Sequence, residues 1–135
     1  MKKLAEIKVI IEKSADQYSA YADNVEGVYG GGNSVNETKK SILEAIELLK
    51  KYNSEENIPA ILKDEYRVIY QMDVPSVLNY YKGIFTLSAL ERLTGINQKQ
   101  LQHYASGLRN PRQKQSQKIE EAFHKLGNEL LSIEL

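Results

Sequence analysis

Amide and cationic side chains gather in the second half of the chain, in a stretch that contains no acid. Between Asn97 and Ile119 there is no Asp or Glu, and the positive residues are Lys99, Arg109, Arg112, Lys114 and Lys118. Such a run is typical of a surface that binds a polyanion, although a solvated basic helix face has the same composition. Its hydrogen-bonding side chains begin with Gln98, Lys99, Gln100, Gln102 and His103. Because Gln pairs with two atoms of adenine and Lys or His donates to guanine, this segment predicts contacts with DNA bases.

Two short helices joined by a tight turn are expected to position these side chains. Thr86 and Asn97 are residue types that cap helix N-termini, and Gly95 is typical of a helix end. We therefore predict helices over residues 86–94 and 98–106, with a three-residue turn between them. This arrangement presents the N-terminal residues of the second helix to a major groove. The alternative is an ordinary helical hairpin with a Gln-rich outer face.

Further helices complete this half of the chain. Asp73 and Pro75 suit a helix start, and Pro111 precedes a last helix that Gly127 is expected to interrupt. Around Pro111, the cations expected to contact phosphates are Arg109, Arg112 and Lys114. Apolar residues alternate in the segment Leu130–Leu135, which allows either a short tail strand or a dimer contact.

The first half of the chain has a strand-like pattern interrupted by one helix. Period-two alternation predicts strands at residues 7–12, 18–23 and 66–72, with a short one at 28–29. A capping box formed by Ser34 and Glu37 predicts a helix from Val35 to Tyr52. The chain is thus predicted to be α+β: a β-β-β-α-β domain over residues 1–73, followed by an all-α domain over residues 74–135.

Three consecutive glycines, Gly30, Gly31 and Gly32, precede the predicted helix of the first domain. Free amides at a helix N-terminus attract anions, but the glycines lack the spacing of the known phosphate-binding loops. We therefore expect them to form a turn that needs positive φ angles.

Composition limits the classes of function. The 135 residues carry 18 basic and 18 acidic side chains, so the formal charge is zero and a uniformly basic coat is excluded. The charges are unevenly divided: residues 1–75 hold 10 basic and 13 acidic residues, and residues 76–135 hold 8 and 5. There is no Cys, and therefore no disulfide or thiolate zinc site. No apolar run is long enough to span a membrane or to form a secretory signal after Met1, so a cytoplasmic location is expected.

The second half resembles the repressor-type, λ-repressor-like helix-turn-helix of small phage and bacterial regulators. The residues that carry the resemblance are Leu90, Thr94-Gly95-Ile96-Asn97-Gln98, Leu101, Gly107, Pro111, Ile119 and Leu126. The resemblance implies base contacts at Gln98, Lys99, His103 and Gln102, and phosphate contacts at Asn97 and Gln100. The chain departs from the family at Glu91, where a small residue, typically Ala, usually allows the two helices to approach closely.

The first half is similar to the HicB family of antitoxins. The similarity lies in Tyr18-Ser19-Ala20-Tyr21-Ala22-Asp23, Gly27-Val28-Tyr29-Gly30, Glu37, Ile42 and Glu44-Ala45-Ile46. It covers residues 7–52 and extends to the strand at 66–72. It implies a partial ribonuclease H-like fold that binds and occludes a small mRNA-cleaving toxin, HicA, and a C-terminal DNA-binding module that represses the operon.

Catalysis by the first domain is not expected. Ribonuclease H chemistry needs carboxylates that converge on Mg²⁺, one of them from the centre of the first strand, where this chain has Lys8-Val9-Ile10-Ile11. His103 and His124 have no Cys or Asp at ligand spacing, so no metal site and no cofactor are predicted.

Three functions are compatible with these patterns. The first is an antitoxin that neutralises a HicA-like toxin and, as a homodimer or higher even oligomer, represses its operon by binding operator DNA. The second is a stand-alone helix-turn-helix transcription regulator whose first domain only dimerises or senses a metabolite. The third, a nuclease with a DNA-targeting module, conflicts with the missing carboxylate set.

Overall fold

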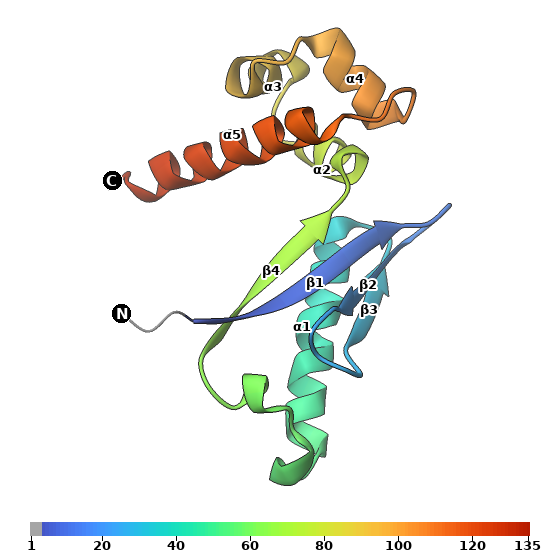
Figure 1. Ribbon diagram of the computed structural model, residues 1–135, viewed down its shortest axis with the longest axis vertical. Helices are drawn as coiled ribbons and strands as arrows, with labels where there is room; N and C mark the ends of the chain where they lie inside the picture. Colours follow the sequence, from blue (N-terminus) through green and yellow to red (C-terminus); the bar gives the residue numbers. More distant parts are fainter. Residues whose placement is uncertain (1–3) are drawn as a thin grey trace. The chain divides into compact units, whose positions relative to one another are not determined.

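The computed structural model describes residues 4–135 of the chain. Over these residues the protein is α+β, with one four-stranded mixed sheet and five α-helices (Figure 1). It divides into two compact units, Met1–Asp73 and Val74–Leu135, and the first three residues of the first unit lie outside the described part. Within the described residues, no helix combines the length and the apolar character needed to cross a membrane.

The first unit is built on a sheet with the strand order β3-β2-β1-β4. Its strands are β1 (Ala5–Lys13), β2 (Tyr18–Ala22), β3 (Tyr29–Gly32) and β4 (Tyr66–Met72). The pairs β1–β2 and β2–β3 are antiparallel, whereas β4 pairs with β1 in parallel. A parallel pair needs a crossover connection, and the segment that contains α1 (Val35–Tyr52) supplies it.

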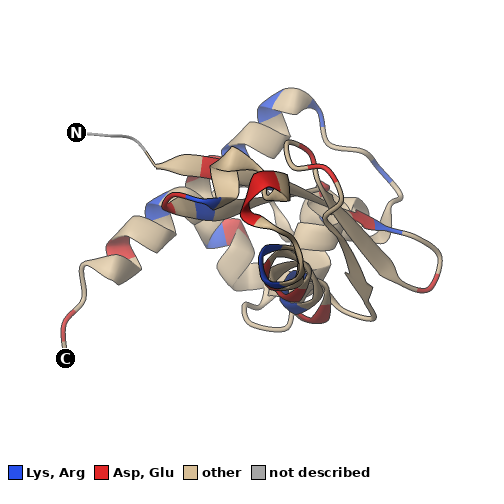
Figure 2. Ribbon diagram, turned by 90° about the horizontal axis from the view of Figure 1, so that it is seen from below, with Lys and Arg blue, Asp and Glu red and all other residues tan. Residues whose placement is uncertain are grey.

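One face of the sheet packs against α1, which lies behind the strands in Figure 1. Ile7, Val9 and Ile11 alternate along β1 and are at most 1% exposed, as expected for a strand with one buried face. From the helix, Ile42 and Ile46 are buried to the same degree. The outer surface of α1 carries charges of both signs, visible where Figure 2 looks along this helix.

The Ser34 cap predicted at the start of α1 is present, and Glu37 reaches back as in a capping box, but to the amide of Asn33, one residue before the cap. The Ser34 hydroxyl accepts a hydrogen bond from the Glu37 amide at 3.1 Å, and the Glu37 carboxylate reaches back to the Asn33 amide at 2.8 Å. After α1, the connection to β4 forms two single-turn 3₁₀ helices, η1 (Glu55–Asn57) and η2 (Ala60–Leu62).

The prediction of a positive-φ turn at Gly30, Gly31 and Gly32 is wrong. These residues form most of β3, and the described glycines with positive φ are Gly27, Gly95 and Gly107. Glycine is required at positions 30 and 32 because α1 packs so closely against β3 that it leaves no room for a side chain. A Cβ on Gly32 would lie 2.7 Å from the Glu37 Cβ, and one on Gly30 would lie 3.0 Å from a backbone nitrogen of α1.

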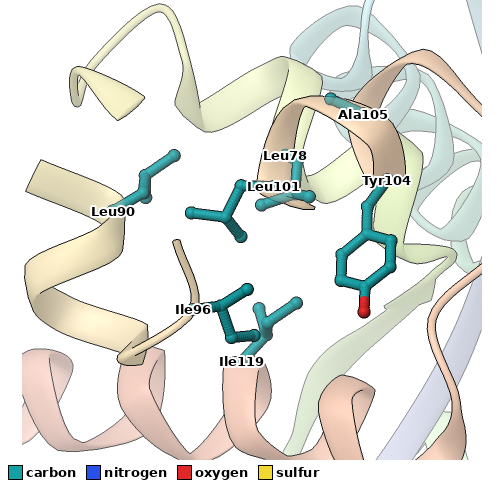
Figure 3. Packing of buried hydrophobic residues seen from close by; sticks show 7 residues of the cluster. All are labelled: Leu78, Leu90, Ile96, Leu101, Tyr104, Ala105 and Ile119. Carbon is teal, nitrogen blue, oxygen red and sulfur yellow. The ribbon is translucent and has the colours of Figure 1, made fainter. Parts of the chain in front are cut away.

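The second unit contains α2 (Val74–Tyr81), α3 (Leu87–Thr94), α4 (Gln98–Ser106) and α5 (Gln113–Leu131). These four helices enclose one hydrophobic core, and Figure 3 shows its side chains pointing toward one another. The buried members of this core are Leu78, Leu90, Ile96, Leu101, Tyr104, Ala105 and Ile119.

The predicted interruption at Gly127 and the possible tail strand are also wrong. Helix α5 runs without a break through Gly127 to Leu131, and residues 132–135 form no strand. A single glycine costs a helix only about 1 kcal/mol relative to alanine, which the hydrogen bonds and core contacts of a 19-residue helix offset.

Candidate nucleic-acid interface

The α3–α4 pair is defined by caps at each end of its turn. The Thr86 hydroxyl accepts from the Ala89 amide at 3.0 Å, and Gly95 ends α3 in the left-handed conformation with φ +76°. The Asn97 side chain accepts from the Gln100 amide at 2.8 Å and so begins α4. The turn therefore comprises Gly95, Ile96 and Asn97, at the length that the sequence predicts.

Side-chain hydrogen bonds and burial fix the turn from inside. The Thr94 hydroxyl donates to the Leu90 carbonyl oxygen at 2.7 Å and accepts from the Ile96 amide at 3.1 Å. The Ile96 side chain is 4% exposed in the core. These contacts leave the turn little freedom, so the direction of α4 relative to α3 is set by the core of the unit.

Glu91 is accommodated by a contact that small residues cannot make. One oxygen of its carboxylate accepts from the backbone amide of Gln98, the first residue of α4, at 3.0 Å. A helix N-terminus carries unpaired amides and a partial positive charge, both of which favour a carboxylate. The large side chain thus joins the two helices by reaching to the end of α4.

The orientation of α4 follows from its apolar residues. Leu101 and Tyr104 are 0% and 2% exposed, which turns the opposite side of the helix outward. Gln98, Lys99 and Gln102, three of the four predicted base-contacting residues, are exposed. The helix therefore presents two amides and one ammonium group to the surroundings.

His103, the fourth predicted base contact, is less accessible than the other three. Its side chain is only partly exposed, and its Nδ1 atom is buried without a hydrogen-bond partner among the described residues. Only Nε2 is left as a ring nitrogen for an external ligand. This lower exposure follows from the position of His103 next to the buried Tyr104, near the edge of the buried side of α4.

The predicted phosphate contacts on α4 have internal partners. The side-chain oxygen of Asn97 is occupied by the cap, so its amide nitrogen is the group left to donate. Gln100 is partly buried, and its amide nitrogen donates to the Tyr104 hydroxyl at 2.8 Å. These bonds hold both side chains in place at the start of α4.

Arginines line a hollow beside α4. It has a volume of about 520 Å³, and its lining residues are Gln100, Tyr104, Arg109, Asn110, Arg112 and Gln115. The lining contains two guanidinium groups and no carboxylate, so it suits an anion. Arg109, Arg112 and Lys114 are all exposed, and the structure brings two of these three predicted phosphate contacts to one hollow.

Two further lysines lie close to the predicted contacts. The Lys82 ammonium group is 3.4 Å from the side-chain oxygen of Gln102. The Lys118 ammonium group lies beside the turn, 3.6 Å from the position that a Cβ on Gly95 would occupy. Lys118 belongs to the acid-free run, so the sequence already indicates it as a cation near this surface. Lys82 precedes the run, and only tertiary packing shows that it lies near Gln102.

The first unit has its own exposed features. On the outer side of α1, Leu43 and Leu48 are 45% and 54% exposed and line a shallow hollow together with lysines and glutamates. Elsewhere in the unit, the Lys39 ammonium group lies 4.7 Å from the centre of the Tyr70 ring. Burial lowers the pKa of Lys39 and raises the pKa of Tyr70. Among residues 4–135, no group of three or more His, Cys, Asp or Glu side chains is placed to hold a metal ion.

The geometry of the second unit suits a ligand that offers hydrogen-bonding groups to α4 and carries negative charge beside them. Gln98, Lys99 and Gln102 supply donors and acceptors on one side of α4, and Arg109 and Arg112 supply fixed positive charge nearby.

No protein-family model matches this chain, and no curated protein or solved structure matches it either.

Proposed function

We propose that the second unit is a helix-turn-helix module that binds operator DNA through α4 and represses transcription. The observation that carries the proposal is the division of α4 into two sides. Leu101 and Tyr104 are held in the core, while Gln98, Lys99 and Gln102 are exposed. A surface that only solvates a helix does not require amides and a lysine in a region without acids, whereas base recognition does.

The positive groups beside α4 would bind the sugar-phosphate backbone. Guanidinium groups bind phosphate oxygens with two parallel hydrogen bonds, and such contacts fix the position of a protein on the duplex without selecting a sequence. Arg109 and Arg112 face one hollow, and Lys114 follows at the start of α5. We assign base contacts to Gln98, Lys99 and Gln102, and a further base contact at the edge of this surface to Nε2 of His103. We assign contacts with the sugar-phosphate backbone to Asn97, Gln100 and these three cations.

We further propose that the first unit, with a partial ribonuclease H-like fold, is an antitoxin domain of the HicB type that occludes a small HicA-like, mRNA-cleaving toxin. The resemblance of residues 7–52 to that family supports this role, as does the order of the two units. Charge supports it as well, because an RNA-cleaving protein needs a basic surface and residues 1–75 carry a net charge of −3.

Two substitutions test DNA binding. A randomised duplex library would be used to select a bound sequence, and affinity would then be measured by fluorescence anisotropy on that sequence and on a scrambled duplex. Lys99→Ala should reduce affinity for the selected duplex by the equivalent of about 1–3 kcal/mol and relax the preference at one base position. Arg112→Ala should weaken binding to both duplexes and make the dependence on salt about one unit shallower.

Lys63→Ala is a matched control, because Lys63 is an exposed lysine of the first unit. It should bind like the parent protein. If Lys99→Ala and Arg112→Ala both retain the parent's affinity, the site assignment is wrong. If no duplex is bound at all, the second unit is not a DNA-binding module.

The antitoxin role is tested by co-expression. The products of the two genes adjacent to this one would be expressed with the chain, and a small basic protein is expected to co-purify and to lose its RNase activity in the complex. If neither neighbour encodes such a protein and none binds, the antitoxin role fails. A stand-alone transcription regulator is then the function that agrees with DNA binding.

A further inference from the structure

The hollow beside α4 has the size of a small-molecule site. Its volume of about 520 Å³ lies within the range of about 300–1,000 Å³ that is usual for such sites. All of its lining residues belong to the second unit, from Gln100 in α4 to Gln115 in the first turn of α5. The hollow is therefore a candidate site for a free ligand as well as a surface that DNA would contact.

The positive charge at the hollow is not neutralised by the chain itself. Arg109 and Arg112 are exposed, and among the described residues no carboxylate forms a salt bridge with either of them. No carboxylate lines the hollow. Two guanidinium groups without a partner favour an anion that can accept hydrogen bonds from both.

Helix α5 begins at the same hollow. Its N-cap residue, Arg112, makes no capping hydrogen bond with its side chain, so the amides of the first turn are left to water or to a ligand. Arg112 and Gln115, which both line the hollow, belong to this end of the helix. The partial positive charge at the N-terminus of a 19-residue helix therefore adds to that of the two guanidinium groups.

Tyr104 supplies a buried donor. Its side chain is 2% exposed but lines the hollow, and Figure 3 shows its hydroxyl pointing toward α5. The hydroxyl accepts a hydrogen bond from the Gln100 amide nitrogen at 2.8 Å, and none of the described residues accepts its own hydrogen. A ligand that accepts this hydrogen must reach deeper than the exposed arginines, to the bottom of the hollow.

We infer that the hollow binds the phosphate monoester group of a small hydroxylated molecule, such as a sugar phosphate. A monoester has three free oxygens and about two negative charges, whereas a phosphodiester of the DNA backbone has one negative charge and two free oxygens. The two guanidinium groups, the Tyr104 hydroxyl and the uncapped helix N-terminus match the larger charge and the third oxygen. The side-chain amides of Gln100, Asn110 and Gln115 line the same space and suit the hydroxyl groups of the ligand.

A bound monoester would occupy two of the cations assigned to DNA. This consequence rests on the proposed DNA-binding function, in which Arg109 and Arg112 contact the sugar-phosphate backbone. Ligand and duplex then compete for the same guanidinium groups, and the ligand releases the protein from DNA. The hollow is in this way a site at which a phosphorylated small molecule relieves repression.

Two small probes distinguish a free phosphate monoester from the DNA backbone. Methyl phosphate has the monoester group, and dimethyl phosphate has the diester group of the backbone. Binding to the isotope-labelled 135-residue chain would be followed by backbone amide chemical shifts at pH 8 and constant ionic strength. Methyl phosphate should bind about tenfold more tightly or better, with the largest shifts in residues 109–116. Equal binding of the two probes, or binding of neither, overturns the inference.

The arginines are tested with a matched cation on the same helix. Arg109→Ala and Arg112→Ala should each raise the dissociation constant for methyl phosphate by about tenfold. Lys118→Ala is the control, because Lys118 is an exposed cation of α5 that does not line the hollow, and this variant should bind like the parent. If the two arginine variants bind methyl phosphate as well as Lys118→Ala does, the phosphate is not held here and the inference is wrong.

Tyr104→Phe tests whether the phosphate reaches the bottom of the hollow. The variant keeps the buried ring and removes the hydroxyl, so it should fold and should bind methyl phosphate about tenfold more weakly. Circular dichroism checks the fold. A folded variant that binds methyl phosphate like the parent contradicts the assignment of the Tyr104 hydroxyl to the ligand.

Ribose 5-phosphate tests the body of the ligand. It should bind more tightly than methyl phosphate, since its hydroxyl groups contact the amides around the hollow. Asn110→Ala should reduce this difference and leave the affinity for methyl phosphate unchanged. Equal affinities of the parent protein for the two probes would overturn the assignment of a hydroxylated ligand.

Competition with the scrambled duplex separates this inference from the proposed function. Ribose 5-phosphate should displace the duplex in fluorescence anisotropy at constant ionic strength, whereas dimethyl phosphate should not. If protein, ligand and duplex bind together, the proposed relief of repression is wrong. A protein that binds methyl phosphate but no duplex retains the site and loses the function. One that binds the duplex but no monoester retains the function and loses the site.

Discussion

The carboxylate of Glu91 accepts the amide hydrogen of Gln98 and thereby joins the end of one helix to the start of the next. At the scale of the single residue, it provides both a hydrogen bond and a negative charge at a helix N-terminus. The same charge lies beside the residues assigned to DNA, where it opposes a polyanion. Under the proposed function, Glu91 therefore favours folding stability and disfavours affinity for DNA.

Glu91→Ala should separate these two effects. Loss of the bond to the Gln98 amide should reduce the free energy of unfolding by about 1 kcal/mol, similar to the loss of a side chain that caps a helix N-terminus. Loss of the negative charge should strengthen binding to the scrambled duplex at low salt. Urea unfolding and fluorescence anisotropy measure the two quantities, with Glu121→Ala on the exposed surface of α5 as the control. A variant that is as stable as the parent would show that the bond contributes nothing.

Gly32 and Gly30 owe their identity to the distance between β3 and α1. Gly32→Ala places a Cβ 2.7 Å from the Glu37 Cβ and 3.0 Å from the Thr38 backbone nitrogen, and Gly30→Ala places one 3.0 Å from the Ile42 backbone nitrogen. Because backbone atoms cannot move aside like the end of a side chain, each variant should lose about 1–3 kcal/mol of unfolding free energy. Urea unfolding followed by circular dichroism measures the loss, and an unchanged midpoint would mean that α1 can shift without cost.

The pKa of Lys39 predicts the sign of a pH effect. Burial lowers this pKa in the folded state, so the unfolded state holds the proton up to its ordinary pKa of 10.5. Between the two pKa values the unfolded chain binds more protons, and the contribution of Lys39 to folding stability rises with pH. The stability of the parent relative to Lys39→Met should therefore increase as pH approaches 10.5. Urea unfolding at pH 8 and pH 10 tests this, and the opposite trend would contradict a lowered pKa.

At the scale of the element, α5 shows how tertiary contacts override a local signal. Gly127 lowers the intrinsic helix propensity of this segment, yet the helix continues to Leu131 because Ile119 and Phe123 anchor it in the core. The turn between α3 and α4 is the opposite case. There the local signals agree with the packing, since the caps at Thr86 and Asn97 flank the buried Ile96.

Gly127→Ala should stabilise α5. A Cβ at this position meets nothing within 4 Å, and alanine is favoured over glycine in a helix by about 0.5–1 kcal/mol. The gain in unfolding free energy should be measured by urea unfolding followed by circular dichroism. A loss of stability instead would show that the glycine is needed by the fold of the single chain.

At the scale of the whole molecule, a formal charge of zero conceals two units of opposite charge. Residues 1–75 have three more acids than bases, and residues 76–135 have three more bases than acids. The proposed attraction to DNA therefore depends on a local set of cations in the second unit, and the proposed basic partner would meet an acidic first unit.

The salt dependence of DNA binding should report the number of these cations. If Arg109, Arg112 and Lys114 each neutralise one phosphate, the logarithm of the binding constant should fall with the logarithm of salt concentration with a slope of about −3 per copy. Titrations of the scrambled duplex at increasing potassium chloride give this slope. A slope close to zero would exclude the assigned backbone contacts.

The sequence by itself determined those helices, strands and turns that depend on capping and on side-chain periodicity. The helix Val35–Tyr52, the strand Tyr66–Met72 and the three-residue turn after α3 all follow from periodicity and capping, and the structure has them where the sequence predicts. These features depend on hydrogen bonds and side-chain spacing within a few residues, which a sequence contains in full.

Only the tertiary structure decided how distant segments act on one another. Gly30, Gly31 and Gly32 lie in strand β3 and not in the predicted turn. Positions 30 and 32 are glycines because α1 packs close to this strand, and neighbouring residues in the sequence do not reveal that approach. The tertiary structure also buried Nδ1 of His103 and gathered Arg109 and Arg112 around one hollow. The burial of a side chain and the distance between two segments depend on how the whole chain packs. Capping and periodicity depend only on residues within one turn of a helix or a few residues of a strand.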